Sequence, residues 1–202
     1  MGYIKNRIKE LSVAAKGKTR ARKIAEEWFS DSLRSRKEDT VVSTRTAFEP
    51  GKIYVFEYAP ITKNLPWFDK NPVVLAMDPT PSGDDIGVNL NLLPIRIKEQ
   101  MLDDLYNNLE GQIKSASSGS KENHAKRQRA LRITYDGVKN YLDQYGFGFA
   151  IRRYKRNRKS KQAVVSYNKW PEIALCDFIE LEGANKTMLR ALFEEYNRNR
   201  NI

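Results

Sequence analysis

The chain has 202 residues, of which 40% are hydrophobic and 30% charged, with a formal net charge of +11, one cysteine and one histidine. This composition indicates a folded, heavily solvated protein and argues against wholesale disorder, while the single Cys176 excludes an intramolecular disulfide and, with the single His124, a zinc site of the Cys/His type. No apolar run reaches the roughly 18 residues of a membrane span and the N-terminal segment does not resemble a signal peptide, so we expect a protein made and kept in a cytoplasm, without a membrane partner.

The first 40 residues are predicted to form a basic helical arm. Between Ala21 and Ser32 apolar residues recur at helical spacing, with basic side chains on the other faces. The apolar face, which includes Trp28 and Phe29, requires a partner, either the chain's own core or another protein of an assembly. A membrane surface is less favoured because acidic residues dilute the cationic face.

Residues 41–112 are predicted to form a β-rich core followed by a helix. Short runs of branched and aromatic residues, separated by Pro and Gly turns, indicate strands. The expected strands are 41–46, 51–58, 72–77 and 86–90. Pro94 then opens a helix that we expect to end at about residue 108. Strands of this length and spacing favour a small antiparallel sheet or a barrel of the SH3-like kind.

The rest of the chain is predicted to be a flexible connector followed by a basic part that packs on the core. Residues 113–125 form the connector because 115–120 contain only Ser, Ala and Gly. Residues 126–202 follow as a helix-hairpin-helix part. Its helices are expected at 123–131, 134–142 and about 185–196, and its hairpin strands at 146–151 and 163–167. The fold class is therefore α+β, with a central antiparallel sheet or SH3-like barrel, flanking helices and a basic β-hairpin.

The positive charge is confined to two blocks. Residues 1–37 carry eleven Lys and Arg against four Asp and Glu, and residues 126–161 carry twelve against two, whereas residues 47–112 carry five against ten. Two basic blocks in an otherwise balanced chain are typical of a polyanion site, usually one for nucleic acid. A solvated face would explain a single block, and an acidic neighbouring subunit would satisfy both.

The tip of the expected hairpin is the main candidate for contact with the backbone of double-stranded DNA. Arg and Lys neutralise phosphates without reading sequence, and the ring of Tyr154 is of the kind that stacks on a base. The candidate residues of this run are Arg152, Arg153, Tyr154, Lys155, Arg156, Arg158, Lys159 and Lys161. The supporting candidates elsewhere are Lys126, Arg127, Arg129, Arg132, Lys16, Lys18, Arg20, Arg22 and Lys23.

The sequence contains no motif for catalysis or for cofactor binding that we recognise, so we predict a protein that is not an enzyme and uses no cofactor or metal. Cys176 lies in an apolar run, which is typical of a buried thiol. The remaining enzyme hypothesis is a metal-dependent nuclease with Asp177, Glu180 and Glu182 as Mg²⁺ ligands and Lys186 nearby. Acidic residues beside apolar ones are more often a solvated face, and that interpretation is favoured.

Three segments in the middle of the chain carry a resemblance to a known family. They are Gly51-Lys52-Ile53-Tyr54-Val55-Phe56-Glu57-Tyr58, Leu65-Pro66-Trp67-Phe68-Asp69-Lys70-Asn71-Pro72-Val73-Val74 and Gly87-Val88-Asn89-Leu90-Asn91-Leu92-Leu93-Pro94. In this order they resemble the DNA end protector family of contractile-tailed, T-even-type bacteriophages. The chain departs from the pattern at Ala59, where the family has Asp, and at Asn91-Leu92, where it has an aromatic pair. The resemblance is that of a divergent member; it covers the middle quarter of the chain, extends loosely into the C-terminal third, and finds no counterpart for residues 1–40.

The resemblance implies a non-enzymatic virion protein, present in the host cytoplasm during assembly, that shields or guides DNA at the genome's end or at the head–tail junction. Shielding an end requires several phosphates to be neutralised at once, which two basic blocks would allow. The alternative is a structural tail or baseplate component whose basic arms dock on neighbouring acidic subunits. Other virion proteins are expected partners in both cases, and the oligomeric state is left open.

Overall fold

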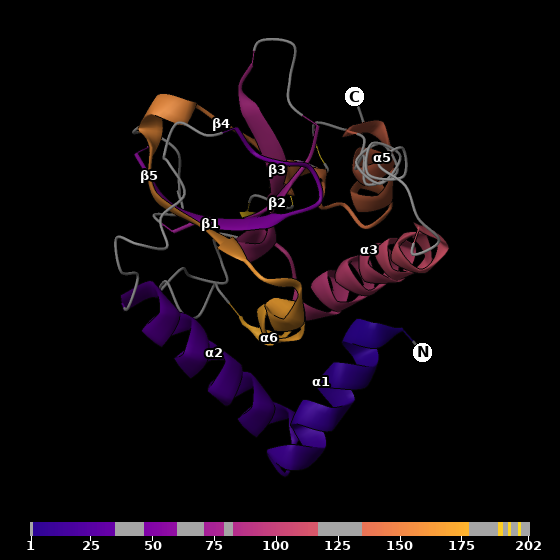
Figure 1. Cartoon of the computed structure of the whole chain (residues 1–202). Coiled ribbons are helices and arrows are strands. Elements are labelled where there is room, and N and C mark those ends of the chain that lie inside the picture. The colour runs from indigo at the N-terminus through magenta and orange to yellow at the C-terminus, as the bar shows by residue number, and fades with distance from the viewer. Residues whose placement is uncertain are drawn as a thin grey trace. The chain divides into compact units, whose positions relative to one another are not determined.

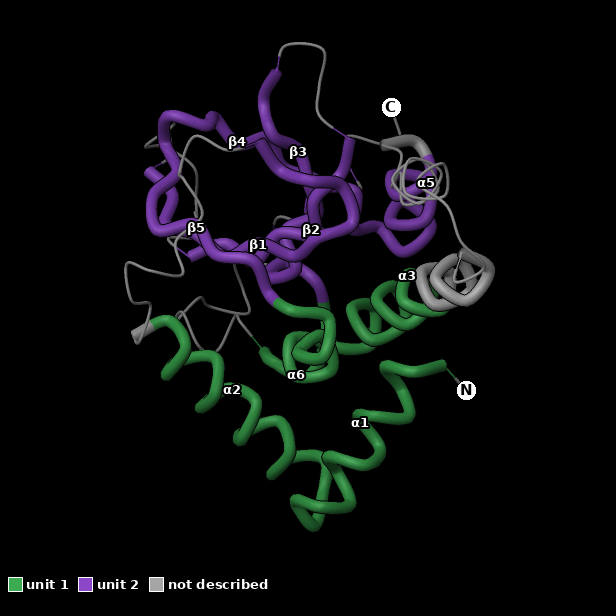
Figure 2. Tube along the Cα trace, viewed as in Figure 1, with its two compact units in different colours: residues 1–35, 94–132, 166–177 green, residues 36–93, 133–165, 178–202 purple. Residues whose placement is uncertain are grey.

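The computed structural model describes residues 2–34, 47–59, 71–78, 83–116 and 135–177, together with residues 190, 191, 194 and 198. The chain divides into two compact units, each assembled from segments that are far apart in sequence (Figure 2). Unit 1 consists of residues 1–35, 94–132 and 166–177, and unit 2 of residues 36–93, 133–165 and 178–202. Within the described ranges, no helix is both long enough and apolar enough to cross a membrane.

Unit 2 is built on a five-stranded antiparallel sheet with the strand order β4-β3-β2-β1-β5 (Figure 1). The strands are β1 (Ile53–Tyr58), β2 (Val73–Ala76), β3 (Asp85–Asn89), β4 (Ile151–Tyr154) and β5 (Lys159–Val165). Helix α5 (Tyr135–Gln144) and the short 3-10 turns η2 (Leu90–Leu92), η3 (Gly148–Ala150) and η4 (Arg156–Arg158) belong to the same unit. The predicted α+β class with an antiparallel sheet is confirmed, and the sheet is open rather than closed into a barrel.

The central strands form because their residues are apolar and branched or aromatic, and they are buried almost throughout. The first four residues of β1 and all of β2 and β3 are buried. Gly87 of β3 lies opposite Ala76 of β2, and a Cβ atom added there would come within 2.5 Å of the Leu75 carbonyl oxygen. Glycine at this position therefore permits the close approach of the two strands.

The hairpin expected within residues 146–167 is wrong in its strand pairing. β4 pairs with β3, placing Tyr154 opposite Asp85, whereas β5 pairs with β1, placing Val164 opposite Tyr54. The two strands lie at opposite edges of the sheet and are linked through η4. A short linker favours local pairing, but the partner of a strand is decided by the packing that distant strands provide.

The other expected elements of unit 2 are partly confirmed. The strands expected at 51–58, 72–77 and 86–90 correspond to β1, β2 and β3, and the helix expected at 134–142 corresponds to α5. Residues 148–150, expected in a strand, form the turn η3. The strand expected at 41–46, the helix expected at 123–131 and most of the last expected helix lie outside the described residues.

Unit 1 is helical in its described part. It contains α1 (Tyr3–Ala14), α2 (Lys18–Arg34), α3 (Ile95–Ala116) and α6 (Trp170–Leu175), with the 3-10 turn η5 (Tyr167–Lys169). The helix expected after Pro94 is confirmed as α3, which continues past residue 108 and takes in residues 113–116 of the expected connector. The rest of that connector lies outside the described residues. Helix α1 lies within residues 1–40, which were expected to be a helical arm, although its own bounds were not predicted, and α6 was not predicted.

Helices α1 and α2 pack through apolar residues spaced four apart. Ile4 and Ile8 are buried on α1, and Ala21, Ala25 and Phe29 are buried on α2. The apolar face of α2 therefore finds its partner within unit 1. A tight turn joins the two helices, and Gly17 in that turn has φ +142°, a conformation that favours glycine.

A fully buried lysine, Lys98 on α3, lies at the packing of α2, α3 and α6. Its Nζ donates a hydrogen bond to the carbonyl oxygen of Cys176. Burial lowers the pKa of Lys98 to about 8, although the nearby Cys176 and Asp177 act in the opposite direction. Cys176 is itself fully buried, and burial raises the pKa of its thiol to about 12, which confirms the interpretation as a buried thiol.

Replacing Lys98 with methionine is expected to change how stability depends on pH. Because the pKa of Lys98 is about 8 in the folded state and about 10.4 in the unfolded state, the unfolded chain binds more protons between these values. The wild type should therefore gain up to about 3 kcal/mol of unfolding free energy, relative to Lys98→Met, as the pH rises from about 8 to 10.4. Urea denaturation at a series of pH values measures this difference, and a difference that is flat across the series would contradict the assignment.

Candidate nucleic-acid interface

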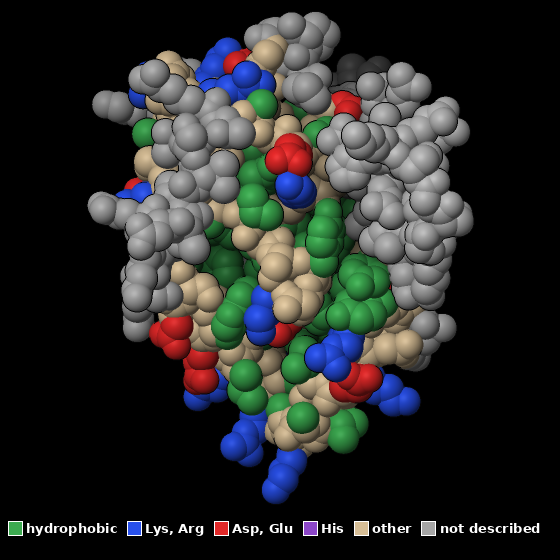
Figure 3. All heavy atoms as spheres, in the orientation of Figure 1, with side chains coloured by type: hydrophobic (Ala, Val, Ile, Leu, Met, Phe, Trp, Pro, Cys, Tyr) green, Lys and Arg blue, Asp and Glu red, His purple; other side chains and the backbone are tan. Residues whose placement is uncertain are grey.

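Exposed cations gather in unit 2 where β4 runs through η4 into β5. We call this set the basic edge; its side chains are partly or fully exposed. It consists of Arg152, Arg153, Lys155, Arg156, Arg158 and Lys161. Figure 3 shows Lys and Arg side chains over this corner of unit 2, at the upper left of the view. Six of the eight residues predicted in this run are thus partly or fully exposed at this edge of the sheet.

The other two predicted residues are buried beneath that surface, and Tyr154 is the first. Its ring is only 4% exposed and packs in an aromatic cluster with Phe48, Tyr54, Phe56 and Tyr58. The Tyr154 ring meets the rings of Phe56 and Tyr58 edge-on, with centroid distances of 5.1 and 5.2 Å. The prediction that Tyr154 stacks on a base is wrong for this fold, because alternation along β4 turns the ring into the core.

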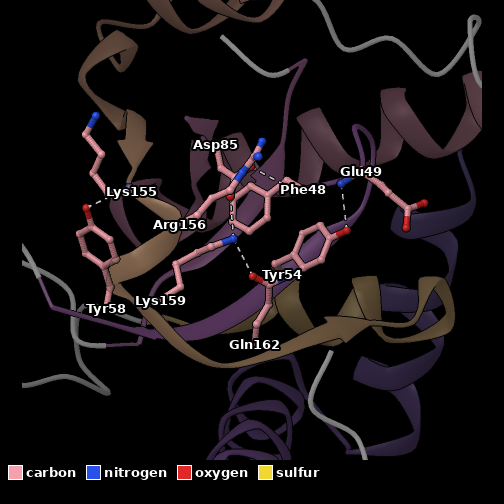
Figure 4. Close-up of polar contacts among 9 residues, drawn as sticks. All are labelled: Phe48, Glu49, Tyr54, Tyr58, Asp85, Lys155, Arg156, Lys159 and Gln162. Carbon is pink, nitrogen blue, oxygen red and sulfur yellow. Dashed lines mark hydrogen bonds and ion pairs between the residues drawn. The ribbon is translucent and has the colours of Figure 1, made fainter. Parts of the chain in front are cut away.

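Lys159, the second buried residue, forms an ion pair with Asp85 inside unit 2 (Figure 4). Its Nζ lies 2.6 Å from Asp85 Oδ2 and 2.6 Å from Gln162 Oε1, and the side chains of the pair are 0% exposed. The same Nζ lies 4.0 Å from the centroid of the Phe48 ring. Burial lowers the pKa of Lys159, while the hydrogen bond to Asp85 acts in the opposite direction. The prediction of Lys159 as a phosphate contact is therefore wrong, and its role is structural.

Asp85 connects the buried pair to the basic edge. Its Oδ1 accepts a hydrogen bond from the backbone N–H of Phe48 at 3.1 Å and lies 3.2 Å from Arg156 Nε. Arg156 is 35% exposed at its side chain, so one side of its guanidinium is fixed from below while the rest faces solvent. This carboxylate therefore fixes the start of β5 and orients one cation of the basic edge.

Two further carboxylates partly neutralise the basic edge. Asp84 Oδ2 lies 2.7 Å from Lys155 Nζ and 3.9 Å from Arg153 Nη1. Glu57 Oε1 lies 2.8 Å from Lys161 Nζ. With Asp85, these make three carboxylates against the seven cations between Arg152 and Lys161, which leaves a local charge of +4. The edge remains strongly cationic after its internal ion pairs are counted.

A β-bulge directs Lys161 to solvent. The register of β5 against β1 shifts between Val55 and Glu57, and Lys161 has φ +48°, an uncommon value for a residue with a side chain. The result is that Lys161 is 61% exposed while the next residue, Gln162, is fully buried and accepts the hydrogen bond from Lys159. The bulge thus places Gln162 in the core and Lys161 on the basic edge.

The supporting candidates of the N-terminal block lie in unit 1. Lys16, Arg20 and Lys23 are exposed on the α1–α2 turn and on α2. Lys18 pairs with Glu99 of α3 at 2.8 Å. Arg22 pairs with Glu26 and Asp177, at 2.8 and 3.2 Å, and so joins α2 to the end of α6 rather than facing solvent. The candidates Lys126, Arg127, Arg129 and Arg132 lie outside the described residues.

The residues of the nuclease hypothesis are not brought together in the part of the chain that the structure describes. Asp177 pairs with Arg22, while Glu180, Glu182 and Lys186 lie outside the described residues. Across the described ranges, no group of three or more His, Cys, Asp or Glu side chains could hold a metal ion.

Residues within the segments that resemble the family have structural roles here, including Asn91, where the chain departs from the family pattern. The Asn89 side chain caps η2 by accepting a hydrogen bond from the backbone N–H of Asn91 at 3.0 Å. The Asn91 amide donates in turn to the backbone carbonyl of Asn71 at 3.3 Å, which joins two of the three resembling segments. Asn at these positions holds the chain where β3 ends.

Fold and surface together define a class: a basic α+β protein whose cations line one corner of a small antiparallel sheet. A family model described as Phage T4 terminal DNA protecting protein matches residues 2–144, and the chain belongs to this family. Neither a curated protein nor a solved structure gives a significant match to the chain. The match includes residues 2–40, for which the resemblance had found no counterpart, and it ends before β4, so the basic edge lies outside it.

Removing the buried carboxylate is expected to destabilise unit 2. Asp85→Asn would leave Lys159 buried without a counter-charge, which should lower the unfolding free energy by about 3 to 5 kcal/mol. Asp143→Asn is the matched control. Asp143 pairs with Lys139, whose side chain is 40% exposed and needs no buried counter-charge, so this substitution should cost less than about 1 kcal/mol. Urea denaturation followed by circular dichroism compares the two, and equal losses would refute a special role for Asp85.

Proposed function

We propose that the chain is a non-enzymatic virion protein that binds the ends of double-stranded DNA, and that the basic edge contacts the phosphate backbone there. The family to which the chain belongs is described as terminal DNA protecting, and this supports DNA ends as the target. The residues of the basic edge neutralise phosphates without reading bases, which suits a protein that must accept any terminal sequence.

The proposal is carried by the exposure of the cations between Arg152 and Lys161: one of them is buried, and the others are partly or fully exposed. Lys159 is held inside unit 2, whereas Arg153, Lys155, Arg158 and Lys161 are exposed on the adjoining surface. A buried aromatic cluster and an ion pair beneath them fix the backbone that carries these side chains. A rigid base presents several charges together, and this reduces the entropy lost on binding.

Neutralising three exposed cations of the basic edge is expected to weaken DNA binding. The variant Arg153→Gln/Arg158→Gln/Lys161→Asn should lose about ten- to a hundredfold in affinity for a linear duplex at about 100 mM salt. The slope of log affinity against log salt should fall by about 2 to 3, as expected for three lost phosphate contacts. Fluorescence anisotropy across a salt series measures both quantities.

The control variant, Lys9→Gln/Lys139→Gln/Arg190→Gln, removes the same net charge from exposed or partly exposed positions elsewhere. The affinity of this control for the linear duplex should stay within about threefold of that of the wild type, since the substituted residues lie outside the proposed phosphate contacts. Equal losses in both variants would place the contact elsewhere. No binding by the wild type at about 50 mM salt would reject DNA as the partner and favour docking on acidic subunits of a tail or baseplate.

Specificity for ends needs its own comparison. A linear duplex and the same sequence closed by a hairpin loop at each end differ only in their free termini. Tighter binding to the open form, with the same salt slope, would support end recognition. Equal affinity would leave phosphate binding intact and contradict recognition of the end.

A further inference from the structure

Two exposed cations of the basic edge converge on one carboxylate. Arg153 and Lys155 are two residues apart on one face at the end of β4, and Asp84 stands beside them just before β3. Asp84 Oδ2 lies 2.7 Å from Lys155 Nζ and 3.9 Å from Arg153 Nη1. The side chains of Lys155 and Arg153 are 47% and 59% exposed, so both remain accessible from solvent while they face the carboxylate.

The neighbouring Asp85 shows what distinguishes Asp84. Asp85 is fully buried and binds the buried Lys159 and the backbone of Phe48, which are groups of the core. Asp84, by contrast, forms ion pairs with two side chains that reach into solvent. Both aspartates are thus buried, but Asp85 engages groups of the core, whereas Asp84 engages cations of the surface proposed to meet DNA.

A carboxylate and a backbone phosphodiester make similar demands on their partners. Each carries one negative charge shared by two terminal oxygens that accept hydrogen bonds from Lys and Arg. Cations already arranged around a carboxylate are therefore also arranged for a phosphate. The side chains of Lys155 and Arg153 are 47% and 59% exposed, whereas that of Asp84 is 11% exposed, so the two cations can turn towards a phosphate in solvent while the carboxylate stays in place.

We propose that Arg153 and Lys155 form a subsite for one backbone phosphate, and that the Asp84 carboxylate occupies this subsite until DNA displaces it. This inference rests on the proposed function. Asp84 keeps the two cations together in the absence of DNA, and its competition with phosphate lowers the affinity that they would otherwise provide. Asp84 is therefore a residue whose removal strengthens binding.

The test compares Asp84→Asn with Asp143→Asn in DNA binding. Both changes remove one negative charge from unit 2, and the two aspartates are alike in exposure, with side chains 11% and 12% exposed, and in pairing with a lysine. Asp84→Asn should bind a linear duplex about three- to tenfold more tightly at about 100 mM salt, with a salt slope steeper by about one. Asp143→Asn should change the affinity by less than about twofold.

A double-mutant cycle separates competition from a general effect of charge. If Asp84 occupies the subsite, Lys155→Gln loses more affinity in the Asp84→Asn background, where Lys155 is fully available to phosphate, than in the wild type. A general charge effect gives equal losses in both backgrounds. Circular dichroism establishes that each variant is folded, and Asp84→Ser replaces Asp84→Asn if the latter is not.

The outcomes distinguish this inference from the proposed function. If the wild type binds DNA but Asp84→Asn behaves like Asp143→Asn, or binds more weakly than the wild type, the subsite is overturned while DNA binding stands. If the wild type does not bind DNA, the proposed function fails first and the subsite fails with it.

Discussion

The basic edge depends on the buried contact between Lys159 and Asp85. A charge pair with no exposed surface is tolerated only where further hydrogen bonds satisfy both partners, and here Gln162 and the Phe48 backbone supply them. The contact fixes the beginning of β5, an edge strand, against the beginning of β3, from which it is separated by β1 and β2 in the strand order. In this way one interior ion pair helps to fix the position of the connection between β4 and β5, which carries the exposed cations.

The net charge alone overstates the number of cations that this surface has available to bind a polyanion. Among the cations between Arg152 and Lys161, Lys159 is buried in an ion pair with Asp85. Lys155 and Lys161 form ion pairs with Asp84 and Glu57. These internal pairs do not abolish the positive field, because three carboxylates stand against seven cations. They reduce its strength, however, and under the proposed function the pairs formed by Asp84 and Glu57 would limit the affinity for DNA.

The sequence was sufficient for local structure and insufficient for pairing and burial. Hydrophobic periodicity located β1, β2, β3 and α5 within a few residues, because each depends mainly on its own pattern. The partner of β4 lies more than 60 residues earlier in the chain, and no local pattern records such a choice. The alternation of Tyr154 with its charged neighbours was a usable signal that its ring faces inward, whereas nothing in the sequence around Lys159 marks it as buried.

The central claim, that the basic edge meets the DNA backbone, is tested most directly by measuring lysine acetylation with and without a linear duplex. Lys155 and Lys161, with side chains 47% and 61% exposed, should react several-fold more slowly when the protein is saturated with DNA. Lys139, 40% exposed on α5, should react at an unchanged rate. Unchanged acetylation of Lys155 and Lys161 under saturating DNA, or equal protection of all three lysines, would contradict the account.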